Sequence, residues 1–315
     1  MPEFDPQRLL SRLRFKHLQL LLALHQGGSL RAAAGLMHLT QPALSKALGE
    51  VESALATPLF LRHARGLQPT PAGAVAIRGA AMLLSELAHW GEETTQQPGG
   101  MVLRIGAPPA LAYGYLPGVL GRLVVEAPQL RVQLKEDQVP RLVEALQDGQ
   151  LDALVTSFPA DMPETTSQPL RYEKLFEMDF AVIAPAGHPA VRASDNLWAD
   201  LARERWILPT RGSMLRRMMD ELFRREGVVA PVPVIESSSP FTNLQLVQAG
   251  LGISALPSPI LEAAPMPDGV RRVCIRSGIS AGPVALVSRG PVPNPRLDVL
   301  RAALGLTQAA GAAAP

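Results

Sequence analysis

The sequence contains one cysteine, Cys274, among its 315 residues. A single cysteine excludes an intrachain disulfide, and it excludes a metal site built from several thiolates. Cys274 stands in the apolar alternation Val273-Cys274-Ile275. Because a free cysteine behaves as a small apolar side chain in such surroundings, we predict that it is a core residue rather than a sensor thiol.

Long apolar runs are also missing. No stretch of about 20 uninterrupted apolar residues occurs, which is what a membrane-spanning helix needs. The Ala-rich segment 72–88 is shorter and contains Arg78 and Glu86, and the first residues lack the apolar core of a secretory signal. The sequence therefore predicts a cytoplasmic protein that has no membrane partner.

The sequence motifs of common enzymes are absent as well. There is no G-x-G-x-x-G after a predicted strand, no P-loop, no G-x-S-x-G elbow and no H-E-x-x-H pair. Five of the six histidines fall within the first 90 residues, and the acidic pair Glu136-Asp137 has no nucleophile or metal-ligand cluster nearby. We therefore expect no catalytic residues, no cofactor and no metal site.

The positive charge of the chain is concentrated at its N-terminal end. Over the whole chain the net charge is only +2. Residues 1–78 hold nine Lys or Arg against four Asp or Glu, a net charge of +5, which leaves −3 for the remaining residues. A basic N-terminal module on a slightly acidic body favours contact with phosphates at one end of the protein.

Two short helices around a tight connection are predicted next to this charge. Apolar residues at helical spacing give each helix a buried face, namely Leu30, Ala33, Ala34 and Met37 on the first and Leu44, Leu48, Val51 and Leu55 on the second. The hydroxyl of Thr40 can cap the second helix. A preceding helix with Phe15, Leu18 and Leu22 on one face completes a small three-helix core.

The exposed start of the second helix indicates DNA recognition. Gln41, Ser45 and Lys46 lie off its buried face, where a helix-turn-helix offers side chains to the major groove. On periodicity alone, an ordinary three-helix unit without a nucleic-acid role stays open. The next residues favour DNA binding, because the apolar anchor 58–61 precedes a short basic loop at 62–66, as expected of a wing that lies along phosphates.

Residues 15–73 resemble the winged helix-turn-helix of LysR-type transcriptional regulators. The matching residues occur throughout this segment, at Gly28-Ser29, Ala33-Ala34, His38, 40–46, Glu52, Leu59-Phe60, Arg62, Arg65-Gly66 and 70–73. The resemblance implies a transcriptional regulator that binds double-stranded DNA at an interrupted dyad.

The resemblance also implies which residues contact DNA. At the start of the second helix these are Gln41, Pro42, Ala43, Ser45 and Lys46, next to the capping residue Thr40. Arg62, Arg65 and Thr70 are expected to contact phosphates. Lys46 stands where family members often have arginine, so bidentate recognition of guanine is less secure because lysine lacks the planar fork.

A long helix is predicted after this DNA-binding domain of residues 1–70. It covers residues 71–92, with Thr70 as its cap and Pro71 in its first turn. The helix could pack on its own domain, but that domain is too small to cover it, and the resemblance implies a dimerising linker helix. We expect its seam at Ile77, Ala81, Leu84 and Ala88, in a homodimer or homotetramer. The polar segment 93–100, broken by Pro and Gly, is predicted to be a hinge.

Short apolar strands alternate with amphipathic helices in the remaining domain, residues 101–308. Two such sets predict two α/β lobes with mainly parallel sheets, lobe I at about 101–176 and 277–308 and lobe II at about 177–276. The expected strands are 102–105, 131–135, 151–155, 180–184, 206–208, 232–235, 253–256, 270–275 and 284–287. The expected helices are 115–126, 140–147, 214–226, 244–249 and one that starts at Asn294-Pro295.

This domain resembles the effector-binding half of LysR-type regulators, which is similar to a type 2 periplasmic binding protein. The matching residues are Arg104-Ile105-Gly106, Leu116-Pro117, 149–152, His188-Pro189, 246–253 and Leu256-Pro257. Residues 107–110 and 136–138 further resemble the branch that includes galactose-binding-protein regulators. A solute-binding protein is the alternative for this domain alone, and the basic N-terminal module counts against it. The predicted fold class is therefore multidomain: an N-terminal all-α winged helix-turn-helix, a linker helix and a C-terminal two-lobed α/β domain.

Two such lobes place a ligand cleft between them, at strand C-termini and helix N-termini. Ser213 and Thr242 would put hydroxyls and free backbone N–H groups where an anion is favoured, although each could be only a helix cap. We expect a small polar or anionic effector, a carboxylate or a sugar-derived metabolite, and RNA polymerase as a further partner. The expected effector-binding residues are Pro109, Ala110, Tyr113, Asp137, Gln138, Thr156, Ser157, Thr210, Arg211, Ser213, Ser238 and Thr242.

Overall fold

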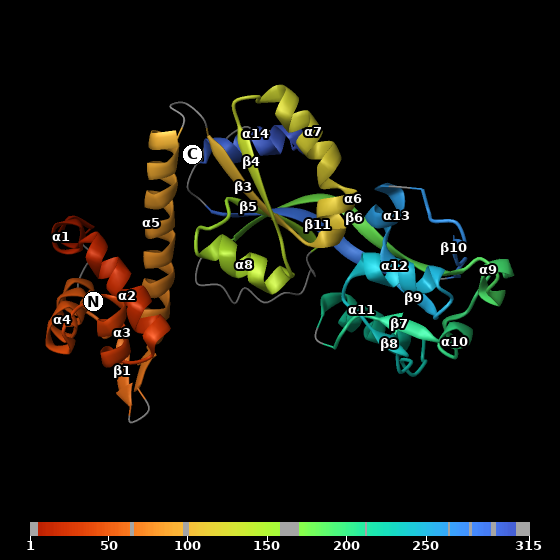
Figure 1. Cartoon of the computed structure of the whole chain (residues 1–315), viewed down its shortest axis with the longest axis horizontal. Helices are drawn as coiled ribbons and strands as arrows, with labels where there is room; N and C mark the ends of the chain where they lie inside the picture. The colour runs from red at the N-terminus through yellow and green to blue at the C-terminus, as the bar shows by residue number, and fades with distance from the viewer. Residues whose placement is uncertain are drawn as a thin grey trace, which may run out of the picture. The chain divides into compact units, whose positions relative to one another are not determined.

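The structure is a computed structural model, and two compact units make up the chain (Figure 1). One unit comprises Met1–Val102 with Val143–Asp152, and the other comprises Leu103–Leu142 with Ala153–Pro315. The residues that the structure describes are 6–63, 66–96, 101–157, 170–211, 213–263, 265–276, 279–290 and 294–306.

The first unit begins with helices that are joined by short caps. The predicted cap at Thr40 is confirmed, since Thr40 Oγ1 accepts the N–H of Ala43 at 3.4 Å, and Ser29, which was not predicted as a cap, accepts the N–H of Ala32 at 3.1 Å in the same way. Gly28 ends the helix before Ser29 with φ 61°, a left-handed conformation that glycine adopts readily. The elements of this part are α1 (Pro6–Arg12), α2 (Phe15–Gly27), α3 (Leu30–Leu36) and α4 (Gln41–Leu55).

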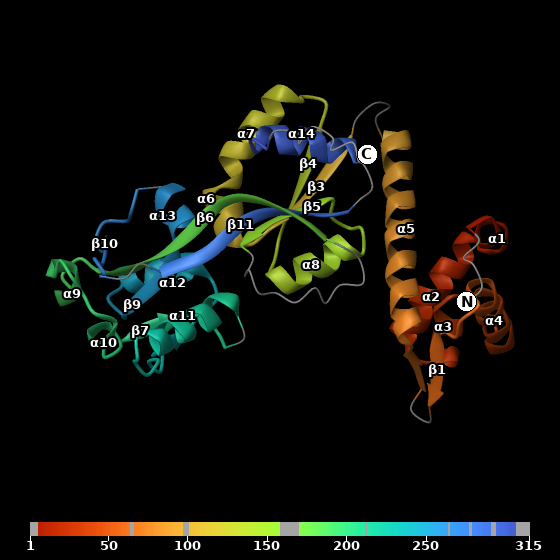
Figure 2. The ribbon, with the colours of Figure 1, turned by 180° about the vertical axis from the view of Figure 1, so that it is seen from behind.

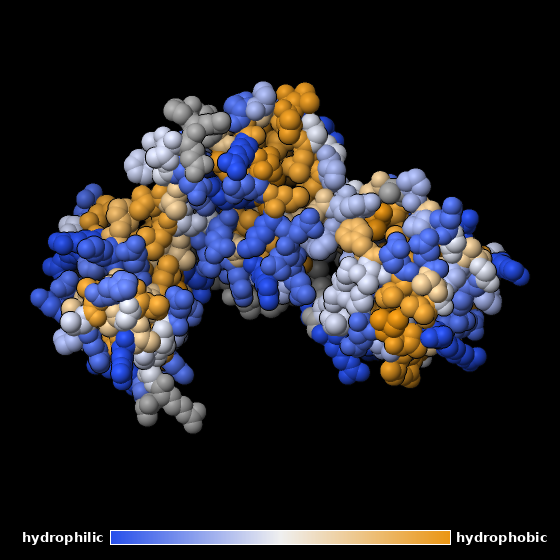
Figure 3. Space-filling view, in the orientation of Figure 1, coloured by the Kyte–Doolittle hydropathy of each residue, from blue (hydrophilic) through white to orange (hydrophobic). Residues whose placement is uncertain are grey.

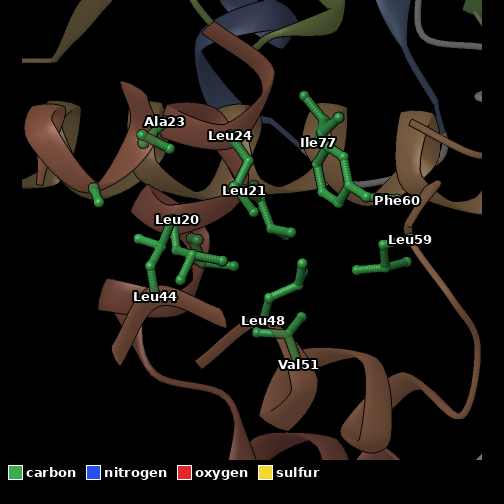
Figure 4. Packing of buried hydrophobic residues seen from close by; sticks show 14 residues of the cluster. Leu20, Leu21, Ala23, Leu24, Leu44, Leu48, Val51, Leu59, Phe60 and Ile77 are labelled. Atoms are coloured by element: carbon green, nitrogen blue, oxygen red, sulfur yellow. The ribbon is translucent and has the colours of Figure 1, made fainter. Parts of the chain in front are cut away.

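Helix α2 is the centre of the core, as Figure 4 shows. Leucines on α2 and α4 pack with Leu59, Phe60 and Ile77, which follow later in the chain. The prediction of a single buried face on α2 is wrong at its edge, because Phe15 is 58% exposed at the helix start. Helix α2 buries more of its circumference instead, since α3, α4 and α5 (Pro71–Gln96) all contact it; its buried leucines are Leu18, Leu20, Leu21 and Leu24.

A two-stranded wing follows α4, built from β1 (Phe60–His63) and β2 (Gly66–Pro69). The carboxylate of Glu52 fixes its start, because Oε1 accepts the N–H groups of Leu59 at 2.7 Å and of Phe60 at 3.3 Å. The return strand is fixed by the N–H of Leu67, which donates to the carbonyl of Gly28 at 2.7 Å. A Cβ at Gly66 would overlap that same carbonyl, so only glycine fits there.

Thr70 joins the wing to α5. Its hydroxyl donates to the carbonyl of Pro58 at 2.9 Å and accepts the N–H of Gly73 at 2.9 Å, which confirms its predicted role as a cap. The hydroxyl proton of Thr70 is donated within the module, which argues against the expected phosphate contact through this hydroxyl.

Helix α5 is longer than predicted. It ends at Gln96, so residues 93–96 of the predicted hinge are helical, and 97–100 lie outside the described residues. By length and composition alone, Pro71–Thr95 is apolar enough to cross a membrane, although one such helix is weak evidence of a membrane segment. Of its most apolar stretch, 17% is buried within the described chain, and most of the remaining residues there are half-buried.

The second unit contains one mixed sheet. Its strand order is β4-β3-β5-β11-β6-β9-β7-β8, with β10 paired to β6. The strands are β3 (Val102–Ala107), β4 (Arg131–Glu136), β5 (Ala153–Ser157), β6 (Leu170–Pro185), β7 (Trp206–Leu208), β8 (Ile235–Glu236), β9 (Ile253–Pro257), β10 (Val270–Arg272) and β11 (Ile279–Arg289).

The prediction of mainly parallel sheets is wrong because of β6 and β11. These two long strands pair antiparallel along their length, and they lie between the lobe I strands and the lobe II strands (Figure 2). The sequence indicated only their most buried parts, since the first half of β6 alternates charged and apolar residues and is largely exposed. Parallel pairing remains within each lobe, between β3 and β5 and between β7 and both β8 and β9.

Helices cover this sheet. They are α6 (Pro109–Gly114), α7 (Leu116–Glu126), α8 (Val139–Gln147), α9 (Pro189–Arg192), α10 (Trp198–Leu201), α11 (Met214–Arg225), α12 (Pro240–Gln248), α13 (Ser258–Ala263) and α14 (Pro295–Ala303). Beneath the lobe II helices, Phe223 meets Trp198 and Trp206 edge-on, with ring centroids 5.4 and 5.7 Å away. Two predictions fail in lobe II. Cys274 is exposed because β10 ends at Arg272, and Val232 is 85% exposed because β8 begins only at Ile235.

The joint at Thr70 gives a stability prediction. Thr70→Val keeps the side-chain shape and removes both hydrogen bonds, so the free energy of unfolding should fall by about 1–2 kcal/mol in urea titrations. The control Thr70→Ser keeps the hydroxyl and should stay near the native value. The salt dependence of DNA binding should not change in either variant. A flatter salt dependence in Thr70→Val would show that the Thr70 hydroxyl contacts a phosphate.

Candidate DNA-binding and effector-binding sites

The exposed face of α4 brings several predicted DNA-contact residues together. Pro42, Ser45 and Lys46 follow one another at i, i+3 and i+4, so they share one side of the helix. Gln41 and Ala43 are exposed beside them, and Thr40 precedes them as the cap. The face opposite is the buried one, with Leu44, Leu48 and Val51.

Gly49 belongs to this exposed face, although the sequence reasoning missed it. It stands seven residues after Pro42, and nothing lies within 4 Å of the place where a Cβ would be. The helical spacing was the signal that could have found it. A glycine at this place lets a binding partner approach the helix backbone closely.

The wing contributes the positively charged side chain of Arg62 to the same face. Arg62 on β1 donates from Nη2 to the hydroxyl oxygen of Ser45 at 3.0 Å, and Arg62 is paired with Leu67 in the wing register. Two residues that were predicted separately, one for bases and one for phosphates, are therefore hydrogen-bonded to each other. Arg65, also predicted, lies outside the described residues.

The four α5 residues predicted to form the dimer interface have different surroundings in the structure. Ile77 is 8% exposed and packs in the DNA-binding module's own core, so its assignment to a dimer seam is corrected. Leu84 packs partly against the same core, Ala81 is half-buried and Ala88 is exposed. The large apolar side chains that stay exposed are on another face, at Val75, Leu83 and Trp90.

On the lobe I side, the predicted effector residues follow the ends of three strands. Pro109, Ala110 and Tyr113 form part of the short helix α6, where a loop was expected. Thr156 and Ser157 lie within β5 and are buried. Asp137 and Gln138 follow β4, and Asp137 Oδ1 accepts the N–H of Gln138 at 2.8 Å.

On the lobe II side, the ends of β7 and β8 lie next to each other. The hydroxyls of Thr210 and Ser238 are hydrogen-bonded at 2.7 Å across this pair. Ser213 caps α11 by accepting the N–H of Arg216 at 3.2 Å, and Arg211 is exposed on the loop before it.

The prediction that Thr242 begins a helix is wrong. Helix α12 starts two residues earlier at Pro240, and Ser239 Oγ accepts the N–H of Thr242 at 3.2 Å. Thr242 is therefore an exposed residue of the first helical turn, and its backbone N–H is not free for an anion. Nearby, Asn243 is buried and its Oδ1 has no hydrogen-bond partner among the described residues.

Phe241 is a site residue that the sequence reasoning missed. Its ring meets the ring of Tyr113 edge-on, with centroids 4.9 Å apart and planes at 70°. Tyr113 follows β3 of lobe I and Phe241 follows β8 of lobe II, so the pair joins the two lobes. Helix α6 is pressed further against lobe II at Gly114, where a Cβ would overlap the carbonyl of Pro259 on α13.

No group of three or more His, Cys, Asp or Glu side chains that could hold a metal occurs in the described parts of the chain. Hydroxyls, amides and exposed aromatic edges dominate the effector-side residues instead. These groups can bind a ligand through hydrogen bonds and apolar contact, and none of them is arranged as a nucleophile with a base.

Comparisons with known proteins agree with this two-part architecture. The family model described as "Bacterial regulatory helix-turn-helix protein, lysR family" matches residues 15–74, and "LysR substrate binding domain" matches residues 96–307. The HTH-type transcriptional regulator GbpR of Azospirillum brasilense is 34% identical over 242 residues, which are 76% of this chain and 70% of that protein.

Two solved structures show the same fold at low identity. A full-length OxyR variant from Pseudomonas aeruginosa superposes with a TM-score of 0.62 at 24% identity, covering 93% of this chain and 95% of that one. Full-length CbnR, solved in complex with its target DNA, gives a TM-score of 0.59 at 20% identity, covering 93% and 99%. The predicted fold class is thereby confirmed. Because the matched family consists of transcription regulators, the expectation that the chain is not an enzyme is also confirmed, and the chain belongs to the LysR family of bacterial transcriptional regulators.

Proposed function

We propose that α4 and the wing of this LysR-family regulator contact an interrupted dyad in double-stranded DNA. The exposed face of α4 carries the proposal, because Pro42, Ser45 and Lys46 stand there beside the wing cation Arg62. In the major groove, Lys46 can donate to guanine, Gln41 can bind adenine bidentately, and Pro42 and Ala43 can contact a thymine methyl. Arg62 and Arg65 add positive charge for phosphates.

Substitutions at Lys46 and Arg65 test this proposal by separating base contacts from phosphate contacts. Lys46→Ala should weaken binding to a selected operator by about 1–3 kcal/mol and leave binding to unrelated duplexes nearly unchanged. Lys46→Arg, which keeps the charge and adds a fork, is the matched control and should retain specific binding. Arg65→Ala should lower the affinity for every duplex and reduce the salt slope by about one. Titrations in which both alanine variants bind like the native protein would remove α4 and the wing from the interface.

We propose a second copy of the chain as the partner of α5. Val75, Leu83 and Trp90 are separated by eight and seven residues, so they lie along one face of the helix. They are 46%, 51% and 64% exposed, and Figure 3 shows hydrophobic surface along this helix. Because the opposite side of α5 is already used in its own module, this face is the one left for a dimer. A tetramer remains compatible with the same pairing.

Charge placed on either side of α5 distinguishes the two faces. Leu83→Asp should give monomers by light scattering, with a folded module and DNA affinity lower by about 100-fold, since two half-sites are no longer bound together. Leu84→Asp should instead lower the unfolding temperature, because Leu84 packs against the module's own core. A Leu83→Asp protein that keeps the native mass would place the dimer contact elsewhere.

We further propose that a small polar or anionic effector binds between lobes I and II. The support is the set of hydroxyls at Thr210, Ser213 and Ser238, together with the exposed charge of Arg211 on the same loops. Hydroxyls and a guanidinium can hydrogen-bond the oxygens of a carboxylate or of a sugar-derived metabolite. The contact of Tyr113 with Phe241 supports a response by lobe closure, because a ligand beside this pair would change its geometry. The same proposal includes that the regulator acts in the cytoplasm and contacts RNA polymerase.

A metabolite screen by thermal shift on the full chain tests the effector site. A genuine effector should raise the unfolding temperature of the native protein, and this shift should shrink by more than half in Ser213→Ala and in Arg211→Ala. Ser194→Ala, an exposed position between α9 and α10 of the same lobe, serves as a control away from the proposed site. A ligand that raises the unfolding temperature of both variants as much as that of the native protein would bind elsewhere on the domain.

A further inference from the structure

The hydrogen bond between Arg62 and Ser45 has a fixed direction. A guanidinium has only donors, so the Ser45 oxygen must be the acceptor of the 3.0 Å contact. A serine hydroxyl has one proton and two lone pairs, and the contact occupies one lone pair. Among the residues that the structure describes, the Ser45 hydroxyl has no other hydrogen bond, so its proton is left to donate elsewhere.

Both partners of this contact are held by rigid elements. Ser45 lies in the second turn of α4, and Arg62 lies in the paired strand β1. Glu52, two turns after Ser45 on the same side of α4, holds the N–H groups of Leu59 and Phe60 at the start of that strand. The distance from the backbone of α4 to the backbone of Arg62 is therefore set by the wing anchor, and a flexible loop does not intervene.

We infer that Arg62 contributes to base specificity through Ser45, by biasing the Ser45 hydroxyl toward donating to DNA. This inference rests on the proposed role of α4 as the recognition helix. In the major groove, purine N7, guanine O6 and thymine O4 accept hydrogen bonds, whereas the amino groups of adenine and cytosine donate them. With Arg62 in place, one lone pair of Ser45 is occupied and the guanidinium charge disfavours a second donor beside it, so Ser45 favours a base acceptor over an amino group at its position in each half-site.

Arg62 is thus a positioning residue for a base contact. A role limited to phosphate attraction predicts a different result, since losing a phosphate contact weakens binding to all sequences alike. Without Arg62, both lone pairs of Ser45 are open to an amino group and no cation disfavours it, so the preference at one position should relax while the others remain. A competing acceptor for the Ser45 proton is the carbonyl of Gln41, one helical turn earlier, and a bond there would leave Ser45 without a base contact.

The experiment selects binding sites from a randomised duplex library with full-length proteins and compares base preferences position by position. The variants are Arg62→Ala, Ser45→Ala and the double variant, with Arg65→Ala as the matched loss of a wing arginine and Lys46→Ala to show that α4 reads bases. We expect Arg62→Ala and Ser45→Ala to lose about five- to tenfold of preference at the same position of each half-site. The double variant should lose no more than either single variant, and Arg65→Ala should keep every preference.

A second measurement changes the DNA instead of the protein. The native protein is titrated with its selected duplex and with duplexes in which single purines are replaced by 7-deazapurines, or thymine O4 by sulfur. Binding should weaken about five- to tenfold at one position per half-site, and Ser45→Ala, as the control, should be insensitive to that replacement.

Three outcomes overturn the inference. In the first, Arg62→Ala lowers affinity for all sequences with unchanged preferences, which leaves Arg62 as a phosphate contact. In the second, Ser45→Ala keeps every base preference, which means that its proton is used within the helix. In the third, the effects of the two single variants add in the double variant. If Lys46→Ala also leaves all preferences intact, the proposed recognition helix itself is wrong, and that result is distinct from the other three.

Discussion

The carboxylate of Glu52 holds the wing against the helix that it accompanies. An ionised carboxylate that accepts two backbone N–H groups is a strong anchor, and the two groups would otherwise be left unpaired beside the buried side chains of Leu59 and Phe60. Thr70 then fastens the returning strand to the same place and starts α5. Contacts with one short segment, Pro58 to Phe60, therefore position α4, the wing and the linker helix relative to one another.

This arrangement gives α5 two tasks that share one piece of secondary structure. Ile77 and Ala80 complete the core of the DNA-binding module, while Val75, Leu83 and Trp90 stay on the surface. A helix is stiff over this length, so whatever binds its exposed face is held at a defined angle to α4. In the proposed dimer, the spacing between the two α4 helices would therefore follow from α5 and its packing, and it would not depend on the side chains proposed to contact bases.

Local signals allowed the sequence to predict much of the fold. The caps at Thr40, Thr70, Ser213 and Asn294 were readable because each is a hydroxyl or amide directly before a helical pattern. Thr242 was misread although the signal was present, since Ser239 followed by Pro240 marks the true start of α12.

Other features depend on partners that are distant in sequence. The apolar faces of α5 were recognisable, but spacing alone could not assign one to the core and another to a second chain. The same limit applies to the antiparallel course of β6 and β11, because exposed charged residues interrupt the apolar pattern of β6. The contacts of Arg62 with Ser45 and of Tyr113 with Phe241 join residues 17 and 128 positions apart, and no local pattern predicts them.

The two strands that connect the lobes have a mechanical consequence. Since β6 and β11 run side by side as a hydrogen-bonded ribbon, one lobe cannot swing about a single backbone bond relative to the other. Any such motion has to twist the ribbon as a torsion spring does, and the elastic energy grows with the angle. The register is irregular between Ser280 and Gly282 and again between Val284 and Ala285, and Gly282 has φ 79°. Fewer ladder bonds resist rotation at these two places, so the compliance of the ribbon is concentrated there, close to its centre.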